Sequence, residues 1–221
     1  MRVRDFVRER YLGVLGGWLV VYLGLFLYLE IVEPEEVFLI SCGVDRWIPC
    51  LPGFVFIYLS WFPYILVCAW LAIRNLSGEE YREVVFVLMV GMNVFLLISY
   101  VWPTGLDLRE GIVYDLGTVS GRLLRFVQTV DTPKSVFPSM HVYVTLVLQY
   151  SLELQRKRLP LWGIWAGRLL AAGIILSTMF TKQHSVVDVT GAIVLFVGLL
   201  NLKIDRILWK IHGQNQGSRV E

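Results

Sequence analysis

The stretch from residue 84 to residue 102 reads VVFVLMVGMNVFLLISYVW and contains no charged side chain. A helix needs about 20 apolar residues to cross a hydrocarbon core of roughly 30 Å. The stretch has this length, and its apolar residues run without the alternation that a membrane β-strand shows. Only helices and closed barrels satisfy their backbone polar groups in lipid, so the stretch predicts a transmembrane helix.

Similar stretches recur along the whole chain of 221 residues, of which 56% are hydrophobic. A water-soluble domain of this size does not need that much apolar surface. We therefore predict an all-α integral membrane bundle of six transmembrane helices, folded as a single domain over residues 1–221. The predicted spans are residues 11–32, 54–73, 84–102, 139–154, 163–180 and 185–204. The first is longer than the apolar core of a signal peptide, which predicts that it is retained.

Lys and Arg are distributed unequally between the two ends of the predicted bundle. With the N-terminus inside, thirteen lie in the inner segments and six in the outer loops. Arg168 lies within a span, where Glu153 of the neighbouring span is an available partner. Cytoplasmic loops carry the excess of positive residues, so both termini are predicted to be cytoplasmic. This places His141 and His184 on the non-cytoplasmic side of the membrane, which we expect to be the cell (plasma) membrane. The net charge of +2 gives no indication of nucleic-acid binding.

The loop of residues 103–138 joins the third and fourth predicted spans, and loops of this length are often functional. Within it, residues 118–130 place three apolar side chains on one helical face, which predicts a short interfacial helix. These side chains are Leu123, Leu124 and Val127. Arg122 and Arg125 project from the same helix, where they contact either lipid phosphates or a bound anionic headgroup.

Cysteine and metal-ligand patterns give no indication of a cofactor. Cys42 and Cys50 share a predicted outer loop, where they form either a disulfide or two free thiols. Cys68 lies within a predicted span and is expected to pack there. No cluster of Cys, His or carboxylate residues has the spacing of a metal site, so we predict a site with neither metal nor cofactor.

Two of the three histidines in the chain begin apolar spans and mark the candidate site. His184 and Asp188 are four residues apart, a spacing that places both on one face of a helix. The carboxylate can then accept the proton of one imidazole nitrogen and leave the other nitrogen basic. Such a pair suits a nucleophilic or general-base histidine; the alternative is a buried structural pair that joins two helices.

The segment before His141 has the composition of an anion-binding helix start. Pro138 and Ser139 predict the first residues of a helix, whose free backbone N–H groups can bind a phosphate. The alternative is a capped helix with an interfacial histidine. Lys182, in the turn before the last span, can balance the charge of a phosphoryl group or extend to lipid headgroups. Lys134 supplies another cation in the segment before the fourth span.

Both histidine segments match motifs of one enzyme family. The matching residues are Pro138, Ser139 and His141 in the first segment and Ser177, Thr178, His184 and Asp188 in the second. They align with the motifs Pro-Ser-x-His and Ser-Arg-x5-His-x3-Asp, so the chain resembles the type 2 phosphatidic acid phosphatase superfamily. The surrounding residues are similar to the branch that includes inositol phosphorylceramide synthases.

Two departures from the family pattern concern its cations. Thr178 stands where the motif Ser-Arg-x5-His-x3-Asp has its arginine. Lys182 is the candidate that replaces the missing cation. The family's first motif, Lys-x6-Arg-Pro, is absent as written, and its nearest counterpart is a reduced motif that ends at Arg109. The resemblance extends a phosphate-binding role to Arg109, so the residues predicted to bind phosphate are Arg109, Lys134, Ser139 and Lys182.

The resemblance implies phosphoryl transfer on a lipid phosphate or phospholipid headgroup in the bilayer. His184 attacks phosphorus to form a phosphohistidine, Asp188 orients it, and His141 protonates the leaving oxygen. With water as acceptor the protein is a lipid-phosphate phosphatase. With an alcohol it is a phospho-headgroup transferase, similar to inositol phosphorylceramide or sphingomyelin synthases. Two non-enzyme alternatives are a haem protein with His141 and His184 as axial ligands, and a membrane scaffold. The oligomeric state is not indicated.

Overall fold

The chain folds mostly into helices, as its apolar stretches predict. The computed structural model describes residues 3–34 and 36–202. Its α-helices are α1 (Val3–Ile31), α2 (Val55–Leu59), α3 (Trp61–Asn75), α4 (Gly78–Val101), α5 (Val119–Val130), α6 (Met140–Leu154), α7 (Leu161–Phe180) and α8 (Val186–Asn201). Two short 3₁₀ helices, η1 (Gly43–Arg46) and η2 (Pro52–Phe54), precede α2. The strand β1 (Phe38–Leu39) pairs in parallel with β2 (Thr104–Gly105), a small departure from the all-α prediction.

Four helical stretches within the described residues are long and apolar enough to cross a membrane. They are Gly13–Ile31, Pro52–Asn75, Gly78–Val101 and Leu161–Phe180. α8 is apolar but shorter, and α6 has 15 residues. The count of six spans therefore stays a prediction, as does the orientation of the termini. The last predicted span also runs beyond residue 202, outside the described residues.

The second predicted span is divided at Ser60, which separates α2 from α3. Backbone hydrogen bonds continue through the division, because the N–H of Ser60 donates to the carbonyl of Phe56 and the N–H of Tyr64 to that of Ser60. α2 contacts η2, α5 and α7, whereas α3 packs against α6. α2, the short first part of this span, therefore lies at the end of the bundle that also holds η2 and α5.

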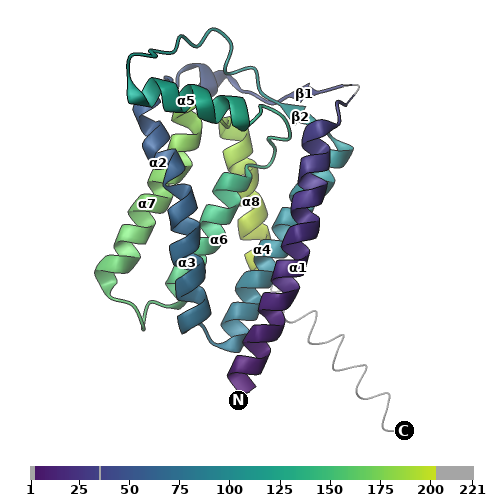
Figure 1. Cartoon of the computed structure of the whole chain (residues 1–221), viewed down its shortest axis with the longest axis vertical. Coiled ribbons are helices and arrows are strands. Elements are labelled where there is room, and N and C mark those ends of the chain that lie inside the picture. Colours follow the sequence, from purple (N-terminus) through teal and green to yellow (C-terminus); the bar gives the residue numbers. More distant parts are fainter. Residues whose placement is uncertain (1–2, 35, 203–221) are drawn as a thin grey trace.

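α6 is the central helix of the bundle and packs against α3, α4, α7 and α8 (Figure 1). Its fully buried side chains include Val142, Tyr143 and Val147. The hydroxyl of Tyr143 donates to the carbonyl of Val87 in α4 (2.5 Å), and its ring lies against Gly91. A Cβ at Gly91 would come within 2.0 Å of that ring, so glycine is needed for this close approach of α4 to α6.

α5 lies across the end of the bundle at which α6 and α8 begin (Figure 1). The helix predicted for residues 118–130 is confirmed: Thr118 caps it by accepting from the N–H of Gly121 (3.1 Å). Leu124 and Val127 are buried in a cluster with Val55 of α2. This apolar contact holds α5 over the starts of α6 and α8, next to which the two predicted histidines lie.

Ion pairs join the helices toward the opposite end of the bundle. The predicted partner of Arg168 is confirmed: its Nε and Nη2 donate to the two carboxylate oxygens of Glu153 (2.7 and 2.8 Å). Arg158, in the turn between α6 and α7, makes a similar two-point contact with Glu80 of α4 (2.8 and 3.1 Å). Paired contacts of this kind are among the stronger charge-assisted hydrogen bonds, and they tie α4, α6 and α7 together.

The three cysteines are free thiols in this structure. Cys68 is buried in the main core, as predicted. Cys42 and Cys50 are half-buried in the loop before α2. Burial raises the pKa of the Cys50 thiol, and the nearby charge of Lys182 acts in the opposite direction.

Candidate active site

The turn between α7 and α8 determines where His184 lies. α7 ends in a Schellman motif: the N–H of Gln183 donates to the carbonyl of Thr178 (2.9 Å), and the N–H of Lys182 to that of Met179 (3.0 Å). The motif needs a left-handed residue, and Lys182 provides it with a φ of 54°. Glycine usually occupies this position, because a side chain there costs roughly 1–2 kcal/mol.

Contacts of the Lys182 side chain explain why lysine is held in this strained position. Its ammonium donates to the carbonyl oxygens of Asp45 (2.8 Å) and Ile48 (2.6 Å), and only 8% of the residue is exposed. The buried carboxylate of Asp45 accepts in turn from the N–H groups of Val186 (2.8 Å) and Cys42 (2.7 Å). Lys182 and Asp45 therefore hold the η1 loop against the start of α8. The ammonium of Lys182, which was predicted to bind phosphate, instead donates to carbonyl oxygens of that loop.

His184 and Asp188 are in contact, but not as a pair on one helical face. α8 begins at Val186 with Ser185 as its N-cap, so the prediction that His184 lies on the helix is wrong. Asp188 is fully buried, and its Oδ2 accepts from the N–H of Ser185 (2.8 Å) in a capping box. The same oxygen lies 3.4 Å from Nδ1 of His184. The capping box, rather than helical periodicity, brings the carboxylate to the imidazole.

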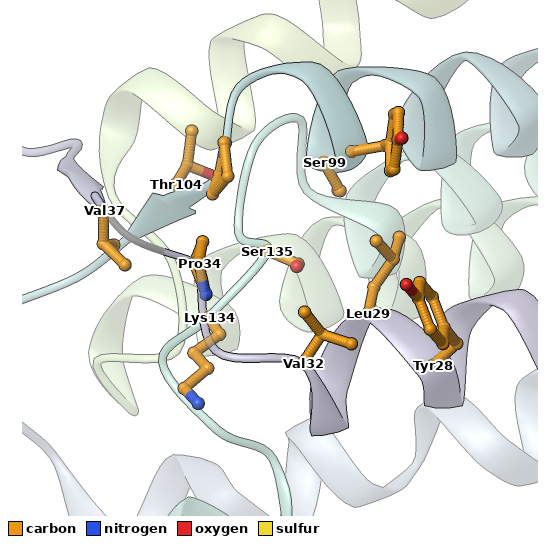
Figure 2. Close-up of a pocket in the computed structure, with 11 residues that line it drawn as sticks. Tyr28, Leu29, Val32, Pro34, Val37, Ser99, Thr104, Lys134 and Ser135 are labelled. Carbon is orange, nitrogen blue, oxygen red and sulfur yellow. The ribbon is translucent and has the colours of Figure 1, made fainter.

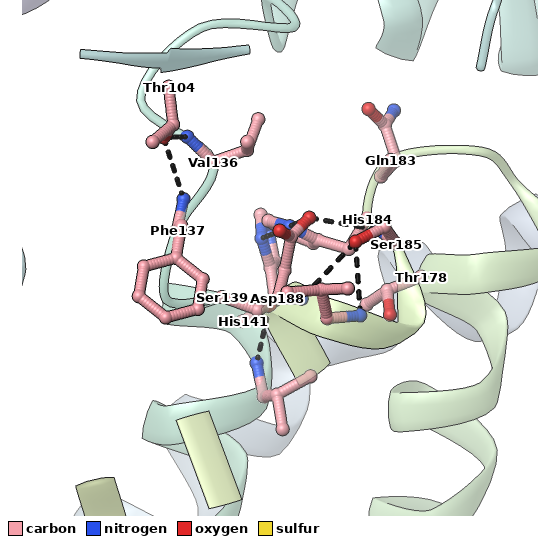
Figure 3. Close-up of polar contacts among 12 residues, drawn as sticks. Thr104, Val136, Phe137, Ser139, His141, Thr178, Gln183, His184, Ser185 and Asp188 are labelled. Carbon is pink, nitrogen blue, oxygen red and sulfur yellow. Dashed lines mark hydrogen bonds and ion pairs between the residues drawn. The ribbon is translucent and has the colours of Figure 1, made fainter. Parts of the chain in front are cut away.

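Ser139 is the N-cap of α6, as the Pro-Ser pair predicts. Its Oγ accepts from the N–H of Val142 (3.3 Å), and its own N–H donates to the carbonyl of Asp188 (3.1 Å). This second bond joins the starts of α6 and α8. The segment that leads into α6 is fixed by Thr104 of β2, whose Oγ1 accepts from the N–H groups of Val136 and Phe137 (both 3.1 Å; Figure 3).

The two predicted histidines meet at these helix starts (Figure 3). Nδ1 of His141 lies 3.4 Å from Nε2 of His184, while Nδ1 of His184 faces Asp188. An in-line displacement needs about 3–3.5 Å between the attacking atom and phosphorus, and about 2.6–3.2 Å between the acid and the leaving oxygen. A phosphate bound between the two imidazoles would therefore have to part the rings.

Tyr58 and Trp61 contact His141 from its other side. The hydroxyl of Tyr58 lies 2.8 Å from Nε2 of His141 and donates to Oδ2 of Asp131 (2.5 Å). The ring of Trp61 packs on the imidazole with centroids 4.5 Å apart. Sequence reasoning did not single out Tyr58 or Trp61. Asp131 opens the segment that contains His141, whereas nothing in the sequence distinguishes Tyr58 among ten tyrosines.

Arg109 contacts the segments that precede both histidines. Its guanidinium donates to the carbonyls of Lys182 (3.1 Å), Gln128 (3.0 Å) and Asp131 (2.6 Å), and to the side-chain oxygen of Gln183. Burial lowers the pKa of this guanidinium, and the charge of Asp131 acts in the opposite direction. Arginine ordinarily titrates so far above neutrality that the group keeps its charge. Arg109 thus joins three loop segments around the histidine pair.

Residues 44–202 match the family model of the PAP2 superfamily. The match covers well over half of the chain and contains both histidines, Asp188 and Arg109. The chain belongs to the PAP2 superfamily. Neither the curated proteins nor the solved structures contain a match to it. The resemblance predicted from the motifs is confirmed at the level of the superfamily, whose members are generally phosphatases that act on phosphate-containing substrates.

Thr178 stands where the PAP2 superfamily motif has arginine, and its surroundings show what it does instead. It is fully buried, and its hydroxyl donates to the carbonyl of Ile175 (2.7 Å). Its carbonyl accepts from the N–H groups of Gln183 (2.9 Å) and His184 (3.1 Å). The position therefore orders the end of α7 in front of the histidine.

Lys134 lines a pocket that does not include the PAP2 histidines (Figure 2). The pocket lies where α1 and α4 end, and its lining also includes Tyr28 of α1 and Ser99 of α4. The ammonium of Lys134 is 3.7 Å from the exposed carboxylate of Glu33. No described contact of the Lys134 side chain supports the predicted phosphate-binding role.

The Arg109 contacts can be tested without a substrate. Arg109→Ala leaves the acceptors of Lys182, Gln128, Asp131 and Gln183 without their donor. Hydrogen bonds to a charged group contribute about 1.5–3 kcal/mol, and losses within one network do not add in full. A net loss of about 3 kcal/mol would lower the apparent Tm in detergent by roughly 6–12 °C. Arg109→Lys is expected to fall nearly as far, because one ammonium does not replace a planar fork of five donors.

Arg122→Ala is the matched control for the Arg109 variants. Arg122 is exposed, and it donates to the carbonyls of Leu116 and Gly117 within its own loop. Its removal is expected to change the apparent Tm by less than about 2 °C, as is usual for exposed polar contacts. An Arg109→Ala protein as stable as the Arg122→Ala protein would contradict the proposed joining role.

Proposed function

We propose that this PAP2 superfamily protein is a membrane lipid-phosphate phosphatase that works through a phosphohistidine. The observation that carries the proposal is the 3.4 Å approach of His141 Nδ1 to His184 Nε2, with Asp188 at the other nitrogen of His184. We further infer six membrane spans with both termini cytoplasmic, as the distribution of Lys and Arg predicts. The reaction then takes place at the non-cytoplasmic leaflet of the cell membrane.

His184 is the proposed nucleophile of this reaction. Asp188 accepts a hydrogen bond from the N–H at Nδ1, so that the lone pair of Nε2 is available to attack phosphorus. As the bond from phosphorus to the leaving oxygen breaks, that oxygen takes a proton from His141. His141 then removes a proton from water, the water oxygen attacks the phosphohistidine, and phosphate leaves.

Charge stabilisation for the transferring phosphoryl group is assigned to the start of α6 and to nearby cations. Ser139 orders the first turn of α6, and the N–H groups of this turn that do not donate to Ser139 are the proposed direct ligands of the phosphate oxygens. Arg109 and Lys182 donate mainly to protein carbonyls. Their positive charges are therefore proposed to stabilise the phosphoryl group electrostatically, without direct contact. The proposed reaction uses no metal ion.

A phospho-headgroup transferase is the second candidate, and the residues around the site support it. The segment Asp-x-Pro-x3-Phe-Pro-Ser-x-His, from Asp131 to His141, resembles the inositol phosphorylceramide synthase branch. The first half of the reaction is the same in both cases. In the transferase an alcohol, rather than water, resolves the phosphohistidine.

A substrate panel tests the proposed function. Purified protein in mixed micelles is incubated with labelled diacylglycerol phosphate, sphingoid phosphate and polyprenyl diphosphate, each with and without a long-chain alcohol acceptor. We expect release of inorganic phosphate from at least one lipid phosphate, at a rate that EDTA does not change. A new labelled lipid in place of free phosphate would instead assign the transferase.

Two outcomes contradict the phosphatase proposal. One is the absence of both free phosphate and new lipid across the whole panel, with a correctly folded protein. The other is a Soret band in the purified protein, which would support haem ligation by His141 and His184. Loss of activity in EDTA that Mg²⁺ or Zn²⁺ restores would contradict the metal-free mechanism alone.

A further inference from the structure

His141 has a partner at each ring nitrogen. Nδ1 faces Nε2 of His184 at 3.4 Å, and Nε2 lies 2.8 Å from the hydroxyl of Tyr58. That hydroxyl donates to Oδ2 of Asp131 at 2.5 Å. Asp131, Tyr58 and His141 therefore form a chain of three groups in which Tyr58 of α2 lies between Asp131, at the end of α5, and His141 of α6. This chain ends at the proposed reacting centre.

The number of protons decides the direction of these hydrogen bonds. Tyr58 has a single hydroxyl proton, and an ionised carboxylate only accepts. The hydroxyl proton therefore points to Asp131, which leaves the Tyr58 oxygen to accept from an N–H at Nε2 of His141. A neutral imidazole carries one N–H, so its Nδ1 then presents a lone pair toward His184.

We propose that Tyr58 and Asp131 are positioning residues that keep a proton on Nε2 of His141 and so reserve Nδ1 for the chemistry. This inference rests on the proposed function. His184 has an equivalent partner in Asp188, which holds its Nδ1 and reserves its Nε2. Each imidazole thus interacts with one carboxylate through the nitrogen that faces away from the other ring. At His184 the contact with Asp188 is direct, and at His141 the hydroxyl of Tyr58 lies between the imidazole and Asp131.

The proton balance of the reaction is complete without any net change at Tyr58 or Asp131. In the first half, protonated His141 gives the proton on Nδ1 to the leaving oxygen while the phosphorus–oxygen bond breaks and the bond to His184 Nε2 forms. In the second half, Nδ1 takes a proton from water while the water oxygen displaces His184 from phosphorus. Nε2 keeps its proton throughout, held by the Tyr58 oxygen.

The surroundings of Tyr58 are rigid enough for a positioning role. Tyr58 is 3% exposed and packs in the cluster formed by Val55, Leu124 and Val127, where α2 meets α5. Asp131 follows α5 directly, and its carbonyl accepts from Arg109 (2.6 Å). Because packing holds Tyr58 and hydrogen bonding holds Asp131, the imidazole is oriented before a substrate enters.

Leaving-group dependence distinguishes this role from a structural one. The test compares dodecyl phosphate, whose alkoxide needs a proton, with 4-nitrophenyl phosphate, whose leaving group departs without one. Tyr58→Phe and Asp131→Asn are each expected to lower kcat for dodecyl phosphate by about 10–100-fold, a part of the full effect of a general acid. With 4-nitrophenyl phosphate the first chemical step should change by less than about 3-fold, measured as the burst of nitrophenol.

Non-additivity and a matched tyrosine complete the experiment. The double variant is expected to be no worse than the more impaired single variant, because Asp131 acts only through Tyr58. Tyr64→Phe is the control: Tyr64 is also buried, but its hydroxyl donates to Gln149 (3.1 Å). It should affect both substrates equally. Equal losses for both substrates in Tyr58→Phe would overturn the proposal and leave Tyr58 a structural residue.

A measurement that needs no turnover separates this proposal from the proposed function. The chain has three histidines, so ¹⁵N-histidine NMR of the protein in micelles can be assigned with single His→Ala variants. We expect neutral His141 to carry its proton on Nε2 in the wild type and to become a mixture of tautomers in Tyr58→Phe. A proton on Nδ1 in the wild type would refute the positioning role even if the lipid panel succeeds. The expected tautomer with no lipid turnover would refute the proposed function alone.

Discussion

His184→Ala is expected to abolish phosphate release, with kcat lower by at least about 10⁴-fold. The reason is chemical: the proposed phosphorus–nitrogen bond forms at Nε2 of this residue, and alanine offers no nucleophile. The fold should survive, because the backbone N–H of residue 184 still donates to the carbonyl of Thr178, and Ser185 still caps α8. The measurement is labelled phosphate released from the best lipid of the panel, with gel filtration to confirm the folded state.

Labelling of the protein itself makes the His184 test specific. Wild-type protein quenched at high pH during turnover is expected to carry an acid-labile phosphoryl group, and His184→Ala should carry none. His212→Ala is the control for loss of a histidine as such, since His212 lies outside the described residues and has no assigned role. A His184→Ala protein that retains more than about one hundredth of the activity, or that still becomes labelled, refutes the nucleophile assignment.

Asp188→Asn should have the second largest effect, a loss in kcat of about 10²–10⁴-fold. Asparagine has nearly the same shape, and its side-chain oxygen can still accept from the N–H of Ser185, so the capping box of α8 is retained in part. What it loses is the negative charge that favours a proton on Nδ1 of His184. The lone pair of Nε2 is then no longer directed to phosphorus in most molecules.

Asp45→Asn is the matched control for this charge. Asp45 is also buried at the start of α8, where its carboxylate accepts from the N–H groups of Val186 and Cys42 and makes no contact with an imidazole. The amide can replace only one of these acceptors, so stability should fall by about 1–3 kcal/mol, while kcat of the folded protein stays within about 5-fold. Similar losses of kcat in Asp45→Asn and Asp188→Asn would show that order at the helix start, and not tautomer control, is what matters.

The helices themselves were predictable because their signals are local. A run of apolar residues, a Pro-Ser helix start and the amphipathic pattern of residues 118–130 each report on one segment, and the structure confirms α4, the N-cap at Ser139 and α5. Glu153 and Arg168 were also predictable, because two opposite charges in neighbouring apolar helices have few other partners. The division of the second span at Ser60 was not, because a continuous apolar run does not distinguish one helix from two.

The motif residues predicted to meet do lie together, whereas the distant residues that contact them were not predicted. His141, His184 and Asp188 do come together. However, the His184–Asp188 contact arises from a capping box. The four-residue spacing predicted the correct pair, but the two residues do not lie on one face of a helix as that spacing implied. Tyr58 is 73 residues from Asp131 and 83 from His141, and periodicity carries no information about such contacts.

The sequence by itself determined which segments form apolar helices and which three ionisable side chains lie near helix starts, because hydrophobicity and helix-start chemistry act between near neighbours. Only the tertiary structure decided how those side chains are held. The ammonium of Lys182 donates to the carbonyl of Asp45, 137 residues away. The imidazole of His141 contacts the hydroxyl of Tyr58, which donates to Asp131. Buried polar groups must find partners within the fold, and packing α5 and the η1 loop over the end of the bundle sets which partners are within reach.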